Sequence, residues 1–320
     1  MPALFAGLVP ANLWAFRVDM KKRDFLSVLD LSRDEMISVL DTARSMKPRY
    51  LGKELDGAVF ALIFEKQSLR TRVTFEAGLL QMGARGIYLA PGDISLGKRE
   101  GVKDVALNLE RWCDGVIARV YSHESLQIMA KTRIPVINAL SDLEHPCQAL
   151  ADFLTMWEKR GDFRFNLAFV GDGNNVAHSL MLMGARLGVN VSVATPRGYE
   201  PKDTVVKRAG EEARGSGARL LVTNDPAEAV RDADFVYTDV WASMGQESEA
   251  AERRKVFVDY QVNEDLMAKA PRGAKFMHCL PAHRGEEVTD GVIDAPYSVV
   301  YDQAENRLHA QKALMKFLFT

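Results

Sequence analysis

The feature that most restricts the fold of this chain is its alternation of short apolar runs with segments of helical periodicity. The run Ala58–Phe64 is apolar throughout and has the length of a strand. An uninterrupted run of this kind is typical of a strand buried on both faces of a parallel sheet. A helical segment follows from about 69 to 82 and ends at Gly83. Earlier, Ser32 and Glu35 have the spacing of a capping box that opens another helix.

The same alternation continues along the whole chain. Further strands are predicted at 86–89, 115–118, 134–137, 166–170, 189–194, 235–239 and 275–279. Pro135 restricts its strand to an edge or an end. A helix is expected to follow the turn at 171–175 and to stop at Gly188. Strands that alternate with helices predict an α/β fold with doubly wound parallel sheets and helices on both faces.

A chain of 320 residues suggests two domains, linked by interdomain helices. The boundary is expected in Glu158–Asp162, after a long helix that begins near Pro146. The predicted divisions are a poorly ordered N-terminal extension (1–24), a first domain (25–157), a second domain (158–304) and a C-terminal helix that packs back on the first domain (305–320).

Composition excludes several classes of protein. Lys and Arg number 41 against 43 Asp and Glu, a net charge of -2 that gives no general attraction to nucleic acid or an acidic membrane. No stretch is long and apolar enough to span a bilayer, and the first twenty residues lack the basic start of a secretory signal. Met20 is an alternative start. Three scattered cysteines fit a reducing compartment, so a cytoplasmic location is expected.

Polar residues follow several predicted strands, where open α/β sheets bind their ligands. After the first run, Ser68 is a natural helix N-cap, followed by Arg70, Thr71 and Arg72. Free N–H groups at a helix start, together with arginine forks, predict an anion site suited to phosphate. The alternative is a capped helix with solvated arginines.

A second candidate lies at His145, Pro146 and Gln148. Proline at the first helical position leaves His145 at the helix mouth, and a residue three positions on can face the same pocket. Helix-end N–H groups favour a neutral, hydrogen-bonding imidazole, although a purely structural histidine remains open. A zinc site with Cys147 is disfavoured because no second pair of ligands follows at a suitable spacing.

The turn 171–175 (Gly-Asp-Gly-Asn-Asn) resembles a dinucleotide fingerprint but has Val176 in place of the third glycine. No acidic residue ends the next strand either, so NAD binding is not expected. Instead, the two asparagines offer amide groups to a polar ligand such as an amino acid.

Two later strands also end in reactive residues. Asp239 precedes a Ser243-Met244-Gly245 segment and is suited to holding an ammonium group, unless it only forms an Asx turn. Cys279 is the last residue of its predicted strand, and it is either a thiol that meets substrate or a small core residue.

Taken together and in this order, six segments resemble the aspartate/ornithine carbamoyltransferase family over the chain after about Phe25. They are SLRTR at 68–72, ARVY at 118–121, HPCQ at 145–148, GDGNN at 171–175, DVWASMG at 239–245 and HCLPAHRG at 278–285. The resemblance implies transfer of a carbamoyl group from carbamoyl phosphate to the side-chain amine of L-ornithine, giving L-citrulline and phosphate, as in arginine biosynthesis. It implies no metal or organic cofactor.

The resemblance also implies roles for single residues. The first domain would bind carbamoyl phosphate and the second ornithine. Carbamoyl phosphate would be held by Ser68, Leu69, Arg70, Thr71, Arg119, His145, Gln148, Cys279, Leu280 and Arg307. Ornithine would be held by Asn175, Asp239, Ser243 and Met244. The catalytic residues implied are Arg70, Arg119, His145, Asp239 and Cys279.

The family forms trimers in which a neighbouring subunit reaches the site, and the corresponding loop is Asp93–Glu100. Two departures stand out: Leu69 replaces a hydroxyl residue, and Ser95 replaces a longer polar side chain. Three other functions stay open. They are carbamoyl transfer to another amine (N-acetyl- or N-succinyl-ornithine, or putrescine), an NAD-dependent oxidoreductase and a catalytically silent regulatory subunit. Whether the reaction serves synthesis or breakdown is also left open.

Overall fold

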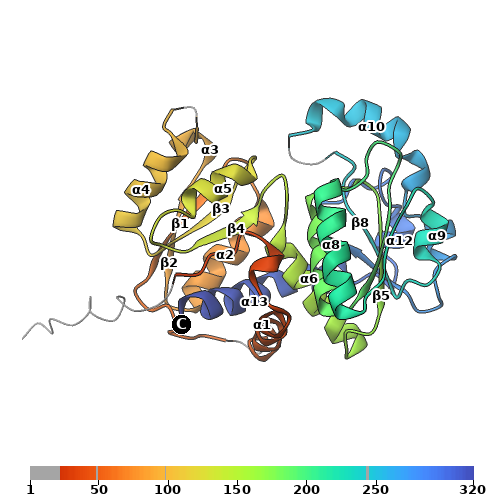
Figure 1. Cartoon of the computed structure of the whole chain (residues 1–320), viewed down its shortest axis with the longest axis horizontal. Helices are drawn as coiled ribbons and strands as arrows, with labels where there is room; N and C mark the ends of the chain where they lie inside the picture. The colour runs from red at the N-terminus through yellow and green to blue at the C-terminus, as the bar shows by residue number, and fades with distance from the viewer. Residues whose placement is uncertain (1–21, 48–49, 98, 243–244) are drawn as a thin grey trace, which may run out of the picture.

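The computed structural model of the chain describes residues 22–47, 50–97, 99–242 and 245–320. Two parallel sheets stand side by side, each with helices on its faces (Figure 1). The predicted α/β fold with two doubly wound sheets is therefore confirmed. Most of the predicted N-terminal extension (1–24), residues 1–21, lies outside the described residues. Within the described part, no helix has both the length and the apolar composition needed to cross a membrane.

The first sheet has the strand order β2-β1-β3-β4, and every pair in it is parallel. Its strands are β1 (Val59–Phe64), β2 (Arg85–Leu89), β3 (Gly115–Arg119) and β4 (Val136–Leu140). The apolar run seen in the sequence becomes β1, which is central and buried along almost its whole length. As predicted, Pro135 lies at an edge, just before β4. The outer side of β4 is covered by Phe25, whose N–H donates to the Val136 carbonyl at 2.9 Å.

The second sheet has the order β7-β6-β5-β8-β9 and is also parallel throughout. Its strands are β5 (Asn166–Val170), β6 (Asn190–Ala194), β7 (Leu220–Thr223), β8 (Phe235–Thr238) and β9 (Lys275–His278). Sequence analysis missed β7. This edge strand is only half buried, so its apolar pattern is too short and too weak to distinguish it from a loop.

Helices connect the strands. They are α1 (Arg33–Ser45), α2 (Leu69–Gln81), α3 (Pro91–Ile94), α4 (Val102–Trp112), α5 (His123–Met129), α6 (Pro146–Arg160), α7 (Asn175–Leu187), α8 (Asp203–Ser216), α9 (Pro226–Val230), α10 (Ala250–Val256), α11 (Glu264–Met267), α12 (Asp290–Ile293) and α13 (Val300–Phe319), with short 3₁₀ turns at Val28–Asp30, Glu247–Glu249 and Val258–Tyr260. Local sequence sets their ends. Ser32 forms the predicted capping box with Glu35, and Gly188 ends α7 at a φ of 87°, a left-handed conformation that suits glycine.

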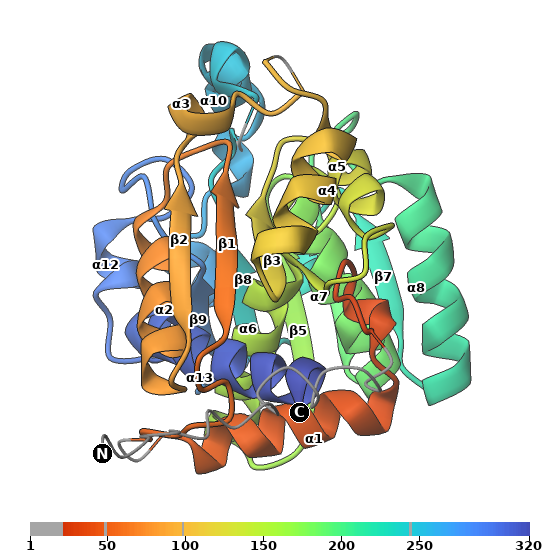
Figure 2. The same cartoon turned by 90° about the vertical axis from the view of Figure 1, so that its left-hand side faces the viewer.

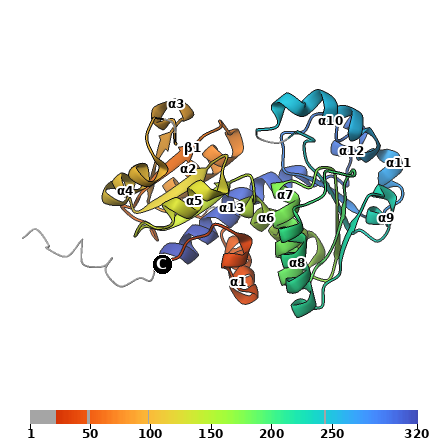
Figure 3. The same cartoon turned by 45° about the horizontal axis from the view of Figure 1, so that its top comes forward.

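Two helices join the sheets. α6 and α13 pack against each other between the two halves, and α13 also contacts α1 and α2 (Figure 3). At its far end, the Phe319 ring meets Phe60 of β1 edge-on, with ring centroids 4.8 Å apart. α13 begins at Val300, five residues before the predicted start at 305. In Figure 2 the arrowheads of β1 and β2 point toward α3 and α10, whereas α1 and α13 lie at the opposite end.

Glu144, just before α6, makes one testable contribution to stability. Its Oε2 accepts from the Val28 N–H at 3.1 Å and from the Ser179 hydroxyl at 3.3 Å, and burial raises its pKa to about 7. A carboxyl with a raised pKa stabilises the fold while it is protonated, and that contribution is lost as pH rises through 7. Between pH 5 and 8, the free energy of unfolding should fall by about 3 kcal/mol more in the wild type than in Glu144→Gln, a difference measured by urea denaturation. Parallel pH curves for the two proteins would contradict this assignment.

Candidate active site

A cavity of about 470 Å³ lies where the loops after the carboxyl ends of both sheets meet. Carboxyl ends of parallel strands gather at one edge of a sheet, so loops distant in sequence converge there. The lining comes from the loops after β1, β3, β4, β5, β8 and β9 and from α13. It comprises Lys66, Gln67, Ser68, Leu69, Arg70, Thr71, Arg119, Leu140, His145, Gln148, Asn175, Val176, Asp239, Val240, Ala242, Cys279, Leu280, Pro281, His283 and Arg307.

One end of the cavity is the N-terminus of α2. Ser68 caps this helix by accepting from the Thr71 N–H at 3.4 Å, as predicted. Arg70 faces the cavity, whereas Arg72 turns away, where it pairs with Glu76 at 2.9 Å and stacks on Tyr88. The two interpretations of this motif, an anion site and a capped helix with solvated arginines, therefore each apply to one of its arginines. Arg70 belongs to the anion site, and Arg72 is a partly solvated surface residue.

Two more arginines bring positive charge to the same end. Arg119, the last residue of β3, donates to the Ser68 hydroxyl at 3.4 Å. Arg307 of α13 is almost fully buried, donates to the Thr71 hydroxyl at 2.9 Å and contacts Gln148 Oε1. Burial, reinforced by repulsion from Arg307 and Arg70, lowers the pKa of Arg119 to about 10. Three guanidinium groups gathered beside a helix N-terminus indicate a site for an anion.

Several buried donors and acceptors around the cavity have no hydrogen-bond partner among the residues that the structure describes. They include Arg119 Nε, Arg307 Nε and His145 Nδ1. Buried polar atoms are nearly always paired, so three unpaired ones beside one cavity indicate a ligand. Burial, followed by repulsion from the three arginines, holds the pKa of His145 well below its usual range. The imidazole is therefore neutral at pH 7, as its place at a helix start predicted.

The opposite wall is formed by Asp239 and Cys279, which follow β8 and β9. The Cys279 thiol donates to Asp239 Oδ1 at 3.0 Å, and the Asn174 amide donates to Asp239 Oδ2 at 2.9 Å. Burial and the neighbouring carboxylate raise the pKa of Cys279 well above its usual range. Cys279 therefore stays a thiol at neutral pH, and its proton points at the Asp239 carboxylate.

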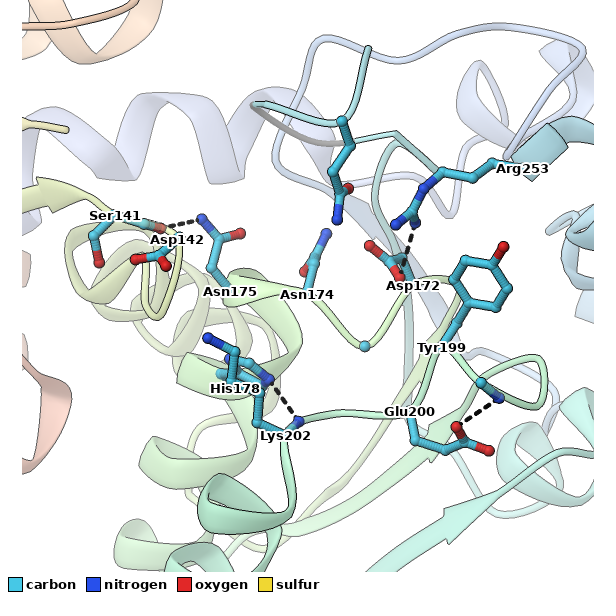
Figure 4. Close-up of a pocket in the computed structure, with 13 residues that line it drawn as sticks. Ser141, Asp142, Asp172, Asn174, Asn175, His178, Tyr199, Glu200, Lys202 and Arg253 are labelled. Atoms are coloured by element: carbon cyan, nitrogen blue, oxygen red, sulfur yellow. Dashed lines mark hydrogen bonds and ion pairs between the residues drawn. The ribbon is translucent and has the colours of Figure 1, made fainter. Parts of the chain in front are cut away.

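The loop between β5 and α7 separates this cavity from a smaller one of about 260 Å³. Figure 4 shows the smaller cavity, with Asn174 and Asn175 side by side and the Arg253–Asp172 ion pair (3.1 Å) across from them. Asn175 lines both cavities and donates to the Ser141 carbonyl at 2.6 Å.

Gly173 in this loop is required by packing. A methyl group there would lie 2.3 Å from the backbone nitrogen of Pro201 and 2.6 Å from the Tyr199 carbonyl oxygen. The glycine therefore lets the loop approach the segment after β6, which explains the incomplete resemblance to a dinucleotide fingerprint.

The segment after β9 is fixed by a buried histidine. His278 Nδ1 accepts from the Leu280 N–H at 2.8 Å, and Nε2 lies 3.1 Å from Glu287 Oε1. Leu280 has a φ of 60°, an unusual conformation for a non-glycine residue. His278, Cys279 and Asp239 have ligand-type atoms within 4.8 Å of one another. However, both ring nitrogens of His278 already have partners, so this set does not fit a metal site.

The family model "Aspartate/ornithine carbamoyltransferase, carbamoyl-P binding domain" matches residues 23–158, and "Aspartate/ornithine carbamoyltransferase, Asp/Orn binding domain" matches 164–318. The chain belongs to the aspartate/ornithine carbamoyltransferase family. The suspected family resemblance is thus confirmed across almost the whole chain.

Relatives in the carbamoyltransferase family are close. An ornithine carbamoyltransferase from Thermococcus kodakarensis is 53% identical over 304 residues, which cover 93% of this chain and 96% of the relative. An anabolic one from Pyrococcus furiosus is 52% identical, with 93% and 96% covered. The solved ornithine carbamoyltransferase of Pyrococcus furiosus has a TM-score of 0.90 at 51% identity, covering 94% of this chain and 98% of that one. The Thermus thermophilus structure has a TM-score of 0.85 at 42% identity, covering 94% and 100%.

Most residues that the family resemblance implied lie around the one cavity. They are Ser68, Leu69, Arg70, Thr71, Arg119, His145, Gln148, Asn175, Asp239, Cys279, Leu280 and Arg307. Ser243 and Met244 lie outside the described residues. Ser95 and the other described residues of 93–100 are not part of the lining in their own chain. Sequence analysis named Asn174 as one of two asparagines suited to a polar ligand, but it did not predict the contact of Asn174 with Asp239. It missed Arg253 and the buried Asp152, for which the sequence carried no signal.

Proposed function

We propose that this chain transfers the carbamoyl group of carbamoyl phosphate to the side-chain amine of L-ornithine, giving L-citrulline and phosphate. One observation carries the proposal. A cationic wall with unpaired buried nitrogens (Arg119 Nε, Arg307 Nε) faces an Asp239–Cys279 wall across a single cavity. The cationic wall suits an acyl phosphate, and the opposite carboxylate suits an incoming amine. The names of relatives at about 50% identity support ornithine as the acceptor.

We assign the phosphate to the start of α2. The free N–H groups of this helix, the Ser68 and Thr71 hydroxyls and the Arg70 guanidinium are arranged as donors to phosphate oxygens. Arg119 and neutral His145 are proposed to donate to the carbamoyl oxygen. When the amine attacks, negative charge develops on that oxygen, and fixed donors stabilise it without reorganisation. Arg307 adds positive charge at the carbamoyl group, while Leu69 contributes its backbone N–H to the phosphate.

Ornithine is assigned to the wall built by the second domain. Asp239 is proposed to hold the side-chain amine and to take up its proton, since Cys279 is a protonated thiol hydrogen-bonded to that carboxylate. Cys279 and Leu280 would line the point where nitrogen meets carbon. Asn175, with Ser243 and Met244, is proposed to bind the amino-acid end. The step then relies on proximity and fixed charges.

The experiment that tests this proposal is an acceptor panel. The purified chain, with carbamoyl phosphate, is offered L-ornithine, N-acetyl-ornithine, N-succinyl-ornithine and putrescine, and the carbamoylated product is measured. Citrulline from ornithine is expected as the main product. If another amine is carbamoylated and no citrulline forms, that amine is the acceptor in place of ornithine. If no amine is carbamoylated, the result favours the silent regulatory subunit.

We further propose a homotrimer located in the cytoplasm. The outer face of α2 and the edge strand β2 expose Leu69, Val73, Leu80 and Ile87, an apolar surface suited to a second copy of the chain. The Asp93–Glu100 loop is proposed to reach the neighbour's site. All three cysteines are free, as a reducing compartment favours. Light scattering should give about three times the chain mass of 35.6 kDa, and Leu80→Glu should lower it. A monomeric wild type would contradict the trimer.

A further inference from the structure

A buried carboxylate lies directly behind the carbamoyl end of the cavity. Asp152 follows Gln148 by one turn of α6 and is fully buried. Its Oδ1 accepts from Gln148 Nε2 and from Gln303 Nε2, both at 2.7 Å, and its Oδ2 accepts from the Tyr237 hydroxyl at 3.1 Å. Three donors converge on this one side chain, and a carboxylate accepts from all of them because it has no proton of its own.

The orientation of both amides follows from groups that can only donate. A guanidinium has no acceptor, so the contact of Arg307 with Gln148 fixes Oε1 toward Arg307 and turns the amide nitrogen toward Asp152. On the other side, the His278 backbone N–H donates to Gln303 Oε1 at 3.0 Å. The Gln303 amide nitrogen therefore also faces Asp152. No freedom to flip remains in either side chain.

The direction of the Gln148 amide has a consequence inside the cavity. One hydrogen bond fixes the position of one atom of the amide group but still lets the group rotate about that atom. A second hydrogen bond to the other amide atom fixes the orientation of the group. Arg307 holds the amide oxygen and Asp152 holds the amide nitrogen, so the remaining lone pair of Oε1 has a fixed direction. Because Gln148 lines the cavity, that lone pair can accept from a substrate N–H, and a methyl group in the same place would leave it unpaired.

We propose that Asp152 is a positioning residue which, together with Arg307, directs Gln148 Oε1 at the NH₂ group of carbamoyl phosphate and so sets the preference for a carbamoyl over an acetyl group. The inference rests on the proposed function, because only a substrate with this NH₂ group uses the fixed acceptor. A site that hydrogen-bonds a substrate N–H rejects the analogue that lacks it, since its own buried group is then left unpaired.

Two ligands that differ by one group test the inference. Phosphonoacetamide and acetonylphosphonate share a phosphonate and a carbonyl, and they differ only in NH₂ against CH₃. Their Kd values are measured by calorimetry at pH 8, above the pKa of about 7 to which burial raises Asp152, so that this carboxyl is mainly ionised. In the wild type, phosphonoacetamide is expected to bind at least about tenfold more tightly than acetonylphosphonate.

Asp152→Ala is expected to lower that preference to about threefold or less, because the water that fills the space both donates and accepts and so fixes no direction. Asp152→Asn keeps one acceptor oxygen and should retain more of the preference than Asp152→Ala. The matched control is Tyr237→Phe. It removes the donor to Oδ2 and an acceptor for Gln303 Nε2 at 3.1 Å, but it leaves the Gln148 bond to Oδ1 in place, so it should keep the wild-type preference.

A general loss of structure weakens the binding of both ligands equally and leaves the ratio of their Kd values unchanged. The ratio therefore separates an effect on positioning from an effect on stability. If Asp152→Ala does not fold, Asp152→Ser replaces it, since a hydroxyl also both donates and accepts. A wild-type ratio in the folded variant, or no preference in the wild type, would overturn the inference while leaving the proposed function intact. Failure of the wild type to bind either phosphonate would instead refute the proposed function.

Discussion

Replacing Arg70 with alanine is expected to lower kcat/KM for carbamoyl phosphate by about 10³-fold, roughly 4 kcal/mol of transition-state stabilisation. Arg70 lies in the cavity beside the N-terminus of α2, where burial lowers the pKa of its guanidinium. A donor fork preorganised in such a place acts on the developing charge of the leaving phosphate. Lysine should recover only part of the loss, because it has a point charge without the fork.

The matched control stands two residues away. Arg72→Ala removes the same chemical group from the same helix, but that guanidinium pairs with Glu76 and stacks on Tyr88 outside the cavity. Steady-state kinetics with carbamoyl phosphate varied at saturating ornithine should show the large loss in Arg70→Ala and a change of less than about threefold in Arg72→Ala. Equal effects from the two substitutions would remove Arg70 from the phosphate site.

Asp239→Asn is expected to lower kcat by about 10²- to 10³-fold, because the amide neither balances an ammonium group nor takes up its proton. The new amide still fills the space between Asn174 and Cys279. In the wild type, the Asn174 amide nitrogen lies 2.9 Å from one Asp239 carboxylate oxygen, and the Cys279 sulfur lies 3.0 Å from the other. The shape of the wall is therefore kept while its charge is lost. Binding of a carbamoyl phosphate analogue should change little, since that ligand is assigned to the opposite wall.

Rapid-quench turnover and calorimetric binding of phosphonoacetamide measure these two quantities separately. The exposed Asp104 of α4 supplies a control, because Asp104→Asn makes the same chemical change far from the cavity and should leave kcat unaltered. If Asp239→Asn weakens the binding of phosphonoacetamide as much as it lowers kcat, Asp239 either binds carbamoyl phosphate or stabilises the fold. Its assignment to the acceptor amine is then wrong.

Much of the cavity was predictable because its residues follow strands. Ser68, Asp239 and Cys279 come just after buried apolar runs, and topology brings such positions to one edge. By contrast, the local pattern of the motif did not decide between Arg70 and Arg72, and only the family resemblance singled out Arg70. Residues two apart on a helix point in different directions, and only the packing of α2 against the first sheet shows which one faces inward.

Other parts of the site depend on contacts that no local pattern encodes. Arg307 reaches Thr71 across 236 positions of sequence, and its place in the cavity was expected only from the family resemblance. Asp152 looks like any acidic residue of a helix, and its burial follows from the packing of α6 between β8 and α13. Asn174 and Asn175 are identical neighbours, and the turn into α7 alone gives one of them to Asp239 and the other to Ser141.

The most direct test of the central claim is a crystal structure of the chain with a phosphonoacetyl amide of ornithine, which joins both substrates in one molecule. The phosphonate is expected at Ser68–Thr71 with Arg70, the carbonyl oxygen between Arg119 and His145, and the amino-acid end near Asn175. A complex in which Arg70, Arg119 and His145 contact different molecules or lie in different crevices would refute the proposed active site.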